Sequence, residues 1–233
     1  MGCQCSQAKE FEPEEETVIT HFEQSLGFGN HTAVHICTQV QVLTVNERLN
    51  WNRLRQLATV LGLDVEGWRS SEEPIARFYE ALKTANDWSA RQLSLLGVLL
   101  GQGSAPVKAS LLFHLYDRDY AGTLSNFRVE EMLLDLCTLA FTHLPRFAQH
   151  MSQTQGDSNT SELIGSYIDR LSEATQTTVH FLAHKLAAEF ITAENFHIRA
   201  QTCLFSAKVL RIEGLAHYKN SLRALQRIRA STI

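Results

Sequence analysis

Four segments of the 233-residue chain repeat one pattern, and this pattern constrains the fold more than any other feature. In each segment an apolar residue precedes a small polar residue, and apolar residues then recur at helical spacing. The segments span residues 49–63, 88–103, 124–136 and 191–204, and their small polar residues are Asn50, Ser89, Ser125 and Thr192. This spacing puts the apolar side chains on one face of a helix. Because alternating β patterns are nearly absent, the sequence predicts an all-α fold.

A second helical segment lies ahead of each of these four. The leading segments span residues 15–26, 73–85, 106–117 and 161–190. Together the pairs of segments form a weak repeat of about 40 residues, which is typical of a supersecondary unit used several times. The predicted unit is a helix, a loop and a second helix.

On these residues the chain resembles four-EF-hand proteins of the calcineurin B and neuronal calcium sensor type. The phrases "LLGQGSAPVKASLLFHLYDRDYAGTLS" and "ITAENFHIRAQTCLF" are similar to the second half of such proteins. The chain is also similar to the acylated N-terminal region of TLDc-domain proteins, whose EF-hands are degenerate. The resemblance implies two EF-hand pairs, at residues 15–103 and 104–206, between a tail of residues 1–14 and a C-terminal amphipathic helix of residues 207–233.

The third loop comes closest to a calcium site. An EF-hand loop supplies oxygen ligands from fixed positions and a bidentate glutamate from its twelfth. With Leu124 as the eighth position, the candidate ligands are Asp117, Asp119, Thr123 and Ser125. Ala121 at the fifth position offers no side-chain oxygen, and Arg128 at the twelfth blocks the site with a fixed positive charge.

Three arrangements of this loop are open. Arg128 could pair with Asp117 and Asp119 and hold the loop closed without metal. The loop could bind calcium weakly with help from Glu130 or Glu131, or it could be a solvated turn. The other three loops do not present two carboxylates at the ligand positions, so we expect no cofactor beyond weak calcium at this one site.

The first six residues, "MGCQCS", predict attachment to a membrane. They match the pattern for N-myristoylation at Gly2, and Cys3 and Cys5 are candidates for palmitoylation. One acyl chain binds membranes only marginally, and the acidic residues that follow exclude a basic patch in the tail as the second signal. No apolar run is long enough to span a bilayer. The expected location is the cytoplasmic face of a membrane.

Two further segments carry expectations. The polar stretch at residues 145–161 is predicted to be an exposed loop. The C-terminal segment carries basic and apolar residues at helical spacing, and it could fold into the protein's own groove, bind an acidic partner or lie on the membrane. We expect the first of these, because an unfilled groove would expose a large apolar patch.

These features predict a lipid-anchored, largely calcium-independent adaptor or regulatory subunit that binds a helix of a partner protein. The candidate core or groove residues are Trp51, Trp88, Phe113, Leu133 and Phe196. The alternative is a calcium sensor that binds one ion in the third loop. A net charge of −4 argues against nucleic acid as the main partner. No motif for an activated nucleophile or an acid–base pair is present, which argues against an enzyme; His180 and His184 lack an obvious third metal ligand.

Overall fold

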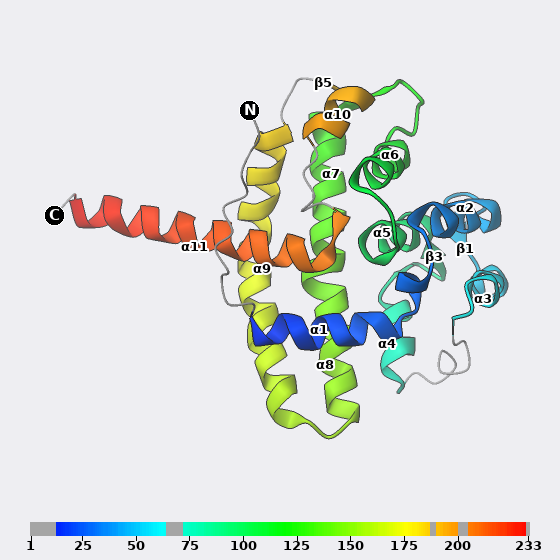
Figure 1. The fold of residues 1–233 in the computed structure, drawn as a ribbon, viewed down its shortest axis with the longest axis horizontal. Helices are drawn as coiled ribbons and strands as arrows, with labels where there is room; N and C mark the ends of the chain where they lie inside the picture. The colour runs from blue at the N-terminus through cyan, green and yellow to red at the C-terminus, as the bar shows by residue number, and fades with distance from the viewer. Residues whose placement is uncertain (1–12, 64–71, 187–189, 200–204, 232–233) are drawn as a thin grey trace.

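The computed structural model is predominantly helical, with two short antiparallel sheets between the helices (Figure 1). The structure describes residues 13–63, 72–186, 190–199 and 205–231. The prediction of a mainly helical fold is confirmed. The strands are two or three residues long, and one of them, Lys83–Thr84, lies within residues 73–85, which the sequence predicted to be helical throughout.

The first half of the chain contains six helices and three strands within the described residues. In order they are α1 (Glu14–Ser25), the 3₁₀ turn η1 (Phe28–Asn30), α2 (Ala33–Leu43), β1 (Arg48–Leu49), α3 (Trp51–Val60), α4 (Pro74–Glu80), β2 (Lys83–Thr84), β3 (Asp87–Ser89) and α5 (Ala90–Leu100).

The second half begins after a short linker at residues 101–104. Its elements are α6 (Ala105–Tyr116), β4 (Thr123–Ser125), α7 (Asn126–Cys137), the π-helical segment η3 (Thr138–His143), α8 (Leu144–Thr154), α9 (Ser158–Leu186), β5 (Phe190–Thr192), α10 (Ala193–Arg199) and α11 (Ala207–Ser231).

The small polar residue of each repeated segment begins a helix, because its side-chain oxygen accepts a hydrogen bond from the first turn. Asn50, Ser89 and Ser125 accept from the backbone N–H groups of the residues three positions on, and Thr192 does the same for Asn195. Such caps satisfy backbone donors that have no partner within the helix.

The apolar residue before each cap lies in a strand, and these strands join the units in pairs. Leu49 is opposite Trp88 in the sheet of β1, β3 and β2. Leu124 is opposite Ile191 in the sheet of β4 and β5. All four side chains are buried. The first unit therefore pairs with the second and the third with the fourth, through equivalent positions of the repeat.

The helix that leads into the first unit differs from the prediction. We expected residues 15–26 in this place, but α2 precedes β1, and α1 packs against α8 and α9 in the second half. The apolar residues Ala33, Ile36 and Val40 form the buried stripe of α2. Thr32 caps this helix by accepting a hydrogen bond from the backbone N–H of His35.

The prediction of an exposed loop at residues 145–161 is wrong. These residues form most of α8, a short turn and the start of α9, which together make the helical hairpin at the lower end of Figure 1. The polar composition belongs to the solvent side of α8, whereas Leu144, Phe147 and Ala148 are buried on the other side. The i, i+3, i+4 spacing of these three residues is the helical signal.

The core is continuous across both halves. Buried side chains from α1 through α11 form one hydrophobic cluster. Phe78 of α4 contacts Phe147 of α8 with ring centroids 5.3 Å apart, and Phe113 of α6 contacts Phe196 of α10 at 5.9 Å. The first part of α11 also joins this core and packs against α9 and η3, whereas we expected the whole C-terminal segment to fold into the protein's own groove. The rest of α11 extends beyond α9 (Figure 1).

Candidate functional site

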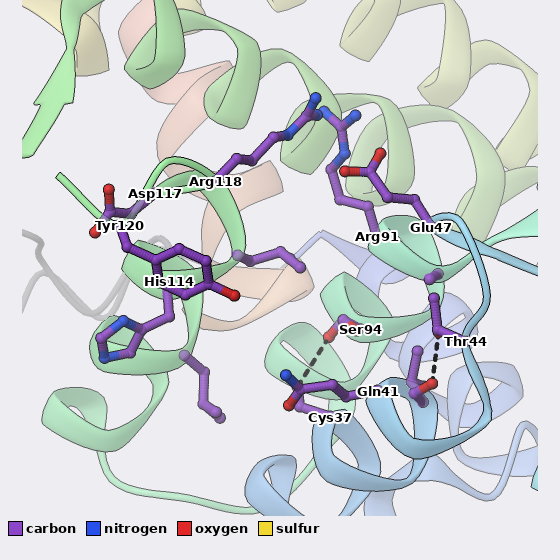
Figure 2. A pocket seen from close by; sticks show the side chains of 14 residues that line it. Cys37, Gln41, Thr44, Glu47, Arg91, Ser94, His114, Asp117, Arg118 and Tyr120 are labelled. Carbon is purple, nitrogen blue, oxygen red and sulfur yellow. Dashed lines mark hydrogen bonds between the residues drawn. The ribbon is translucent and has the colours of Figure 1, made fainter. Parts of the chain in front are cut away.

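An open pocket of about 360 Å³ lies between α2, α5, α6 and the third loop (Figure 2). Its apolar wall consists of Cys37, Val40, Ala90, Leu111 and Leu115. Polar side chains line the rest of the pocket, among them Gln41, Thr44, Glu47, His114 and Tyr120. A concave surface with an apolar wall and a few polar groups is typical of a binding site.

Two rim residues of this pocket have left-handed backbones. Glu47 has φ of 61° and Tyr120 has φ of 54°. Non-glycine residues adopt this conformation at a cost, and such strain often accompanies binding sites. Tyr120 is 87% exposed, and Figure 2 shows its ring at the edge of the pocket. An exposed tyrosine at a pocket rim offers a large contact area together with a hydrogen-bonding hydroxyl.

Cys37 lies within the pocket, but its thiol is not activated. The sulfur donates to the carbonyl oxygen of Ser94 at 3.5 Å. Burial raises the pKa of this thiol to about 12, so it is a neutral thiol at physiological pH. The side chain therefore contributes to the apolar wall.

Asp117, the first candidate ligand of the third loop, is buried at the pocket edge. Its Oδ2 accepts a hydrogen bond from the backbone N–H of Gly122 at 3.0 Å, which closes the turn. Gly122 has φ of 70°, a conformation that glycine adopts without strain. The other oxygen, Oδ1, is buried and has no hydrogen-bond partner within the described structure.

The other candidate ligands lie around this turn without forming a ligand cage. Asp119 is exposed. Thr123 and Ser125 lie in β4, and the Ser125 hydroxyl is occupied in capping α7. Over the residues that the structure describes, there is no group of three or more histidine, cysteine, aspartate or glutamate side chains that could hold a metal ion.

The predicted pairing of Arg128 with Asp117 and Asp119 is wrong. Arg128 instead donates from Nη1 to Oε2 of Glu131 at 2.7 Å. The two residues are three positions apart on α7, which brings their side chains together along the helix. The guanidinium therefore lies along α7 and does not close the loop over its carboxylates.

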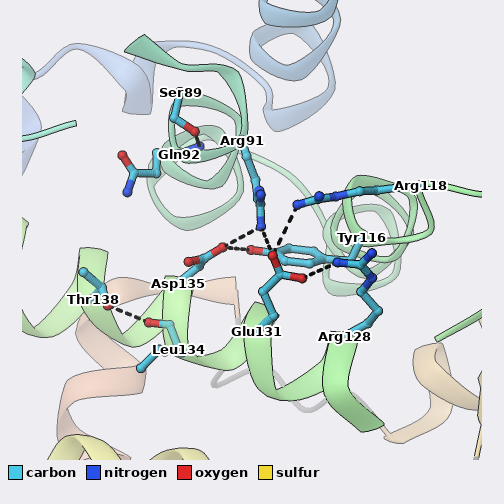
Figure 3. A network of polar contacts seen from close by, with 10 residues as sticks. All are labelled: Ser89, Arg91, Gln92, Tyr116, Arg118, Arg128, Glu131, Leu134, Asp135 and Thr138. Atoms are coloured by element: carbon cyan, nitrogen blue, oxygen red, sulfur yellow. Dashed lines mark hydrogen bonds and ion pairs between the residues drawn. The ribbon is translucent and has the colours of Figure 1, made fainter. Parts of the chain in front are cut away.

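Arg128 belongs to a larger network that joins the third loop and α5 to α7 (Figure 3). Glu131 accepts from three arginines: Arg91 of α5, Arg118 of the loop and Arg128. Arg91 also donates to Asp135 at 3.2 Å, and the Tyr116 hydroxyl donates to the same carboxylate at 2.6 Å.

Glu131 is the centre of this network. Partial burial raises the pKa of its carboxyl, but hydrogen bonds from Arg128 and Arg91 outweigh that effect and hold the pKa below the usual value of 4.5. The carboxylate is therefore charged at neutral pH and binds three cations at once. The network fixes the position of the loop relative to α5 and α7 without a metal ion.

The predicted groove residues lie mainly in the core. Trp88, Phe113, Leu133 and Phe196 are all buried, so none of them is available to a partner. Trp51 is partly buried and packs against Trp88, with ring centroids 5.8 Å apart. These side chains hold the paired units together, which agrees with the interpretation of them as core residues.

No protein-family model, curated protein or solved structure matches this chain.

The remaining predictions concern two histidines of α9, membrane-spanning segments and the N-terminal tail. His180 and His184 are exposed on α9 and belong to no metal-binding group of the described residues. Among the described residues, no helix is long and apolar enough to cross a membrane. Gly2, Cys3 and Cys5 lie outside the described residues, so their acylation stays a prediction.

Sequence reasoning missed the pocket because its residues come from three separate helices. Cys37 and Val40 belong to α2, a helix that we did not predict, and their place beside Leu111 and Leu115 depends on how α2 packs against α6. The arginine network had a usable local signal in the i, i+3 spacing of Arg128 and Glu131. The contributions of Arg91 and Arg118 depend on tertiary packing and left no such signal.

Proposed function

We propose that this chain is a lipid-anchored adaptor or regulatory subunit that works largely without calcium and uses four degenerate EF-hand units as a scaffold. The observation that carries the proposal is the pairing of the units through equivalent positions, Leu49 with Trp88 and Leu124 with Ile191. EF-hand units associate in pairs through short strands in their loops. The capping residue that follows each strand is also repeated in all four units.

Calcium independence is supported by the loops themselves. The first, second and fourth loops lack the carboxylates that a hard cation needs. In the third loop, Arg118, Arg128 and Glu131 form contacts that require no ion. Sensor EF-hands change shape because calcium reorients their helices, so an ion-free network in this place favours one constant state.

The pocket between α2, α5 and α6 is the proposed partner site. It has an apolar wall, it is open to solvent, and Tyr120 stands at its rim. Helices that bind in such grooves insert apolar side chains at helical spacing. We therefore expect an amphipathic helix of a partner protein to bind here.

Calorimetry tests the calcium-independent state. Titration of the unacylated protein with calcium, at physiological magnesium, should give no heat of binding. Arg128→Glu restores a carboxylate at the twelfth loop position, and Arg128→Gln removes the cation without adding a ligand. Binding by Arg128→Glu alone would mean that the missing carboxylate keeps the loop empty. Micromolar binding by the wild type would refute the proposal.

One observation favours a calcium sensor as the second candidate. Oδ1 of Asp117 is buried without a partner among the described groups, and a buried carboxylate oxygen normally has one. A cation in the loop would satisfy it. The wild-type titration decides between the two candidates.

Lipid anchoring has a separate test. Metabolic labelling with a myristate analogue should label the wild type and leave Gly2→Ala unlabelled, and Cys3→Ser with Cys5→Ser should lose palmitate labelling. The Gly2→Ala protein should move from the membrane fraction to the soluble fraction of the cell. Unchanged fractionation of Gly2→Ala would contradict an acyl anchor.

A further inference from the structure

The helix α11 has two halves with different surroundings. In the first half, Leu210 and Leu215 are buried against the core, and the Arg211 side chain is completely buried. In the second half, Lys219 and Arg223 are exposed and Leu222 is 41% exposed. Its first residues still contact α9, where His217 stacks on Phe181 and Tyr218 donates to Glu173, and Figure 1 shows the remainder extending past α9. At 1.5 Å per residue, residues 216–231 form about 24 Å of helix.

The extending half is basic, in contrast to the rest of the chain. Residues 216–231 include Lys219, Arg223, Arg227 and Arg229 and contain no aspartate or glutamate, although the whole chain has a net charge of −4. Leu222, Leu225 and Ile228 follow one another at intervals of three residues. A helix with basic residues beside an apolar stripe is typical of segments that lie at a membrane surface.

The first turn of α1 lies at the base of this extending half. Glu16 accepts two hydrogen bonds from the Arg211 guanidinium, both at 2.8 Å, and Glu23 accepts a third at 2.7 Å. Glu15 pairs with Arg170 of α9. The beginning of α1 is therefore fixed to the buried half of α11 and to α9.

The fixed start of α1 limits how far Gly2 can lie from the base of α11. Glu14 lies twelve positions after Gly2, and a chain of that length spans at most about 40 Å. That reach exceeds the length of the extending half of α11. An acyl group on Gly2 and the basic half of α11 can thus contact the same surface at the same time.

We infer that residues 216–231 of α11 bind the anionic lipid surface of a membrane and supply the second attachment signal beside the acyl groups. The inference rests on the proposed lipid anchoring, because one acyl chain holds a protein only marginally and needs a second contact. Charge complementarity selects the partner: phosphatidylserine and related lipids attract clustered lysine and arginine residues. The tail itself is acidic near α1 and cannot supply this attraction.

Vesicle cosedimentation of the full, unacylated chain tests the inference directly. The protein should bind vesicles of phosphatidylcholine with phosphatidylserine and should not bind phosphatidylcholine alone. Raising the salt concentration should weaken the binding, since screening shortens the range of the attraction. Each basic residue near the surface contributes about fivefold to the partition coefficient, so Lys219→Gln with Arg223→Gln should reduce it about twenty-five-fold.

A matched control changes the same charges elsewhere. Arg48→Gln with Arg55→Gln removes two exposed cations from β1 and α3, which lie on the side of the molecule away from the end of α11 (Figure 1). This variant should bind phosphatidylserine vesicles like the wild type. Equal losses in both double variants would overturn the inference, because they would indicate an unspecific effect of total charge.

Other outcomes of the vesicle assay would point to a different partner for residues 216–231. Equal binding to neutral vesicles would overturn the charge argument. Absence of vesicle binding would also overturn the inference, and concentration-dependent self-association in light scattering would then identify a second copy of the chain as the occupant. Because the protein in this assay carries no acyl group, each result is independent of the Gly2→Ala test of the lipid anchor.

Discussion

The Arg211 guanidinium lies completely inside the protein and is balanced by two carboxylates. It donates to Glu16 and Glu23 and to the carbonyl oxygen of Ala140. The Tyr167 hydroxyl also donates to Glu16. Burial raises the pKa of Glu23 although the nearby Arg211 charge opposes this effect. The cluster joins α1, η3, α9 and α11, so a single residue connects both ends of the described chain.

Replacement of Arg211 by methionine should destabilise the protein strongly. The change leaves Glu16 and Glu23 buried without their cation, and breaking a buried ion pair from one side costs about 3–5 kcal/mol. Urea unfolding followed by circular dichroism measures the loss in the free energy of unfolding. The control is Arg223→Met on the exposed half of the same helix, which should change that energy by less than about 0.5 kcal/mol. Similar losses for the two variants would contradict the stabilising role of the cluster.

Glu131 should make the stability of the protein depend on pH in the acid range. The pKa of this carboxyl in the folded state is below 4.5, so its contribution is present above that pH and is lost as the pH falls through the folded value. Glu131→Gln should therefore lower the free energy of unfolding by about 1–2 kcal/mol at neutral pH and by progressively less below pH 4.5.

Glu130→Gln is the control for this pH profile, because Glu130 is the exposed neighbour on α7. Urea unfolding of the wild type and both variants across the acid range gives the comparison. A difference between wild type and Glu131→Gln that does not change with pH would show that the carboxylate charge is not the source of the effect.

Two helical glycines differ in what surrounds them, and this difference shows how closely the elements pack. A Cβ atom on Gly214 of α11 would lie 2.6 Å from Cζ of Phe141, a fully buried ring of η3. A Cβ atom on Gly165 of α9 would approach the side-chain amide of Gln149 at 2.8 Å, and that flexible end can move. The first contact is fixed by the core and the second is not.

The same substitution should accordingly have different effects at the two glycines. Gly214→Ala should destabilise the protein by about 1–3 kcal/mol, because the added methyl group forces α11 away from η3. Gly165→Ala should change stability by less than about 1 kcal/mol, since alanine favours the helix and Gln149 loses only one hydrogen bond. Thermal unfolding of the two variants side by side checks the contrast, and equal effects would mean that α11 adapts its position on η3.

At the scale of elements, the sequence predicted the helices that begin with a capping residue and missed those defined by packing. Asn50, Ser89, Ser125 and Thr192 provide a local start signal, so the helices that follow them were predicted within a few residues. The segment of α8 is polar except for one narrow stripe, and composition suggested a loop.

The place of α1 against α8 and α9 depends on Glu15 and Glu16 finding partners more than 150 positions away, at Arg170, Tyr167 and Arg211. No periodicity within one segment contains that information.

The two paired halves share one core across the whole molecule. Gln102 in the linker bonds with the backbone of the segment that precedes α2: its N–H donates to His31 and its carbonyl accepts from Ala33. Phe78 of α4 in the first half contacts Phe147 of α8 in the second half. Buried residues of both halves belong to one cluster. We therefore expect the two halves to unfold together.

The positions of the tryptophans allow a test of this cooperativity. All three, Trp51, Trp68 and Trp88, belong to the first half, so tryptophan fluorescence reports that half, whereas far-ultraviolet circular dichroism reports helices throughout the chain. Leu171→Ala changes a fully buried residue of α9 in the second half and should cost about 2–5 kcal/mol. If the halves unfold together, this variant shifts the fluorescence and dichroism midpoints in urea by the same amount, because coincident transitions are the mark of a single cooperative unit. A fluorescence midpoint that stays at the wild-type value would instead mean that the first half folds independently of the second, and that the contact of Phe78 with Phe147 is too weak to couple them.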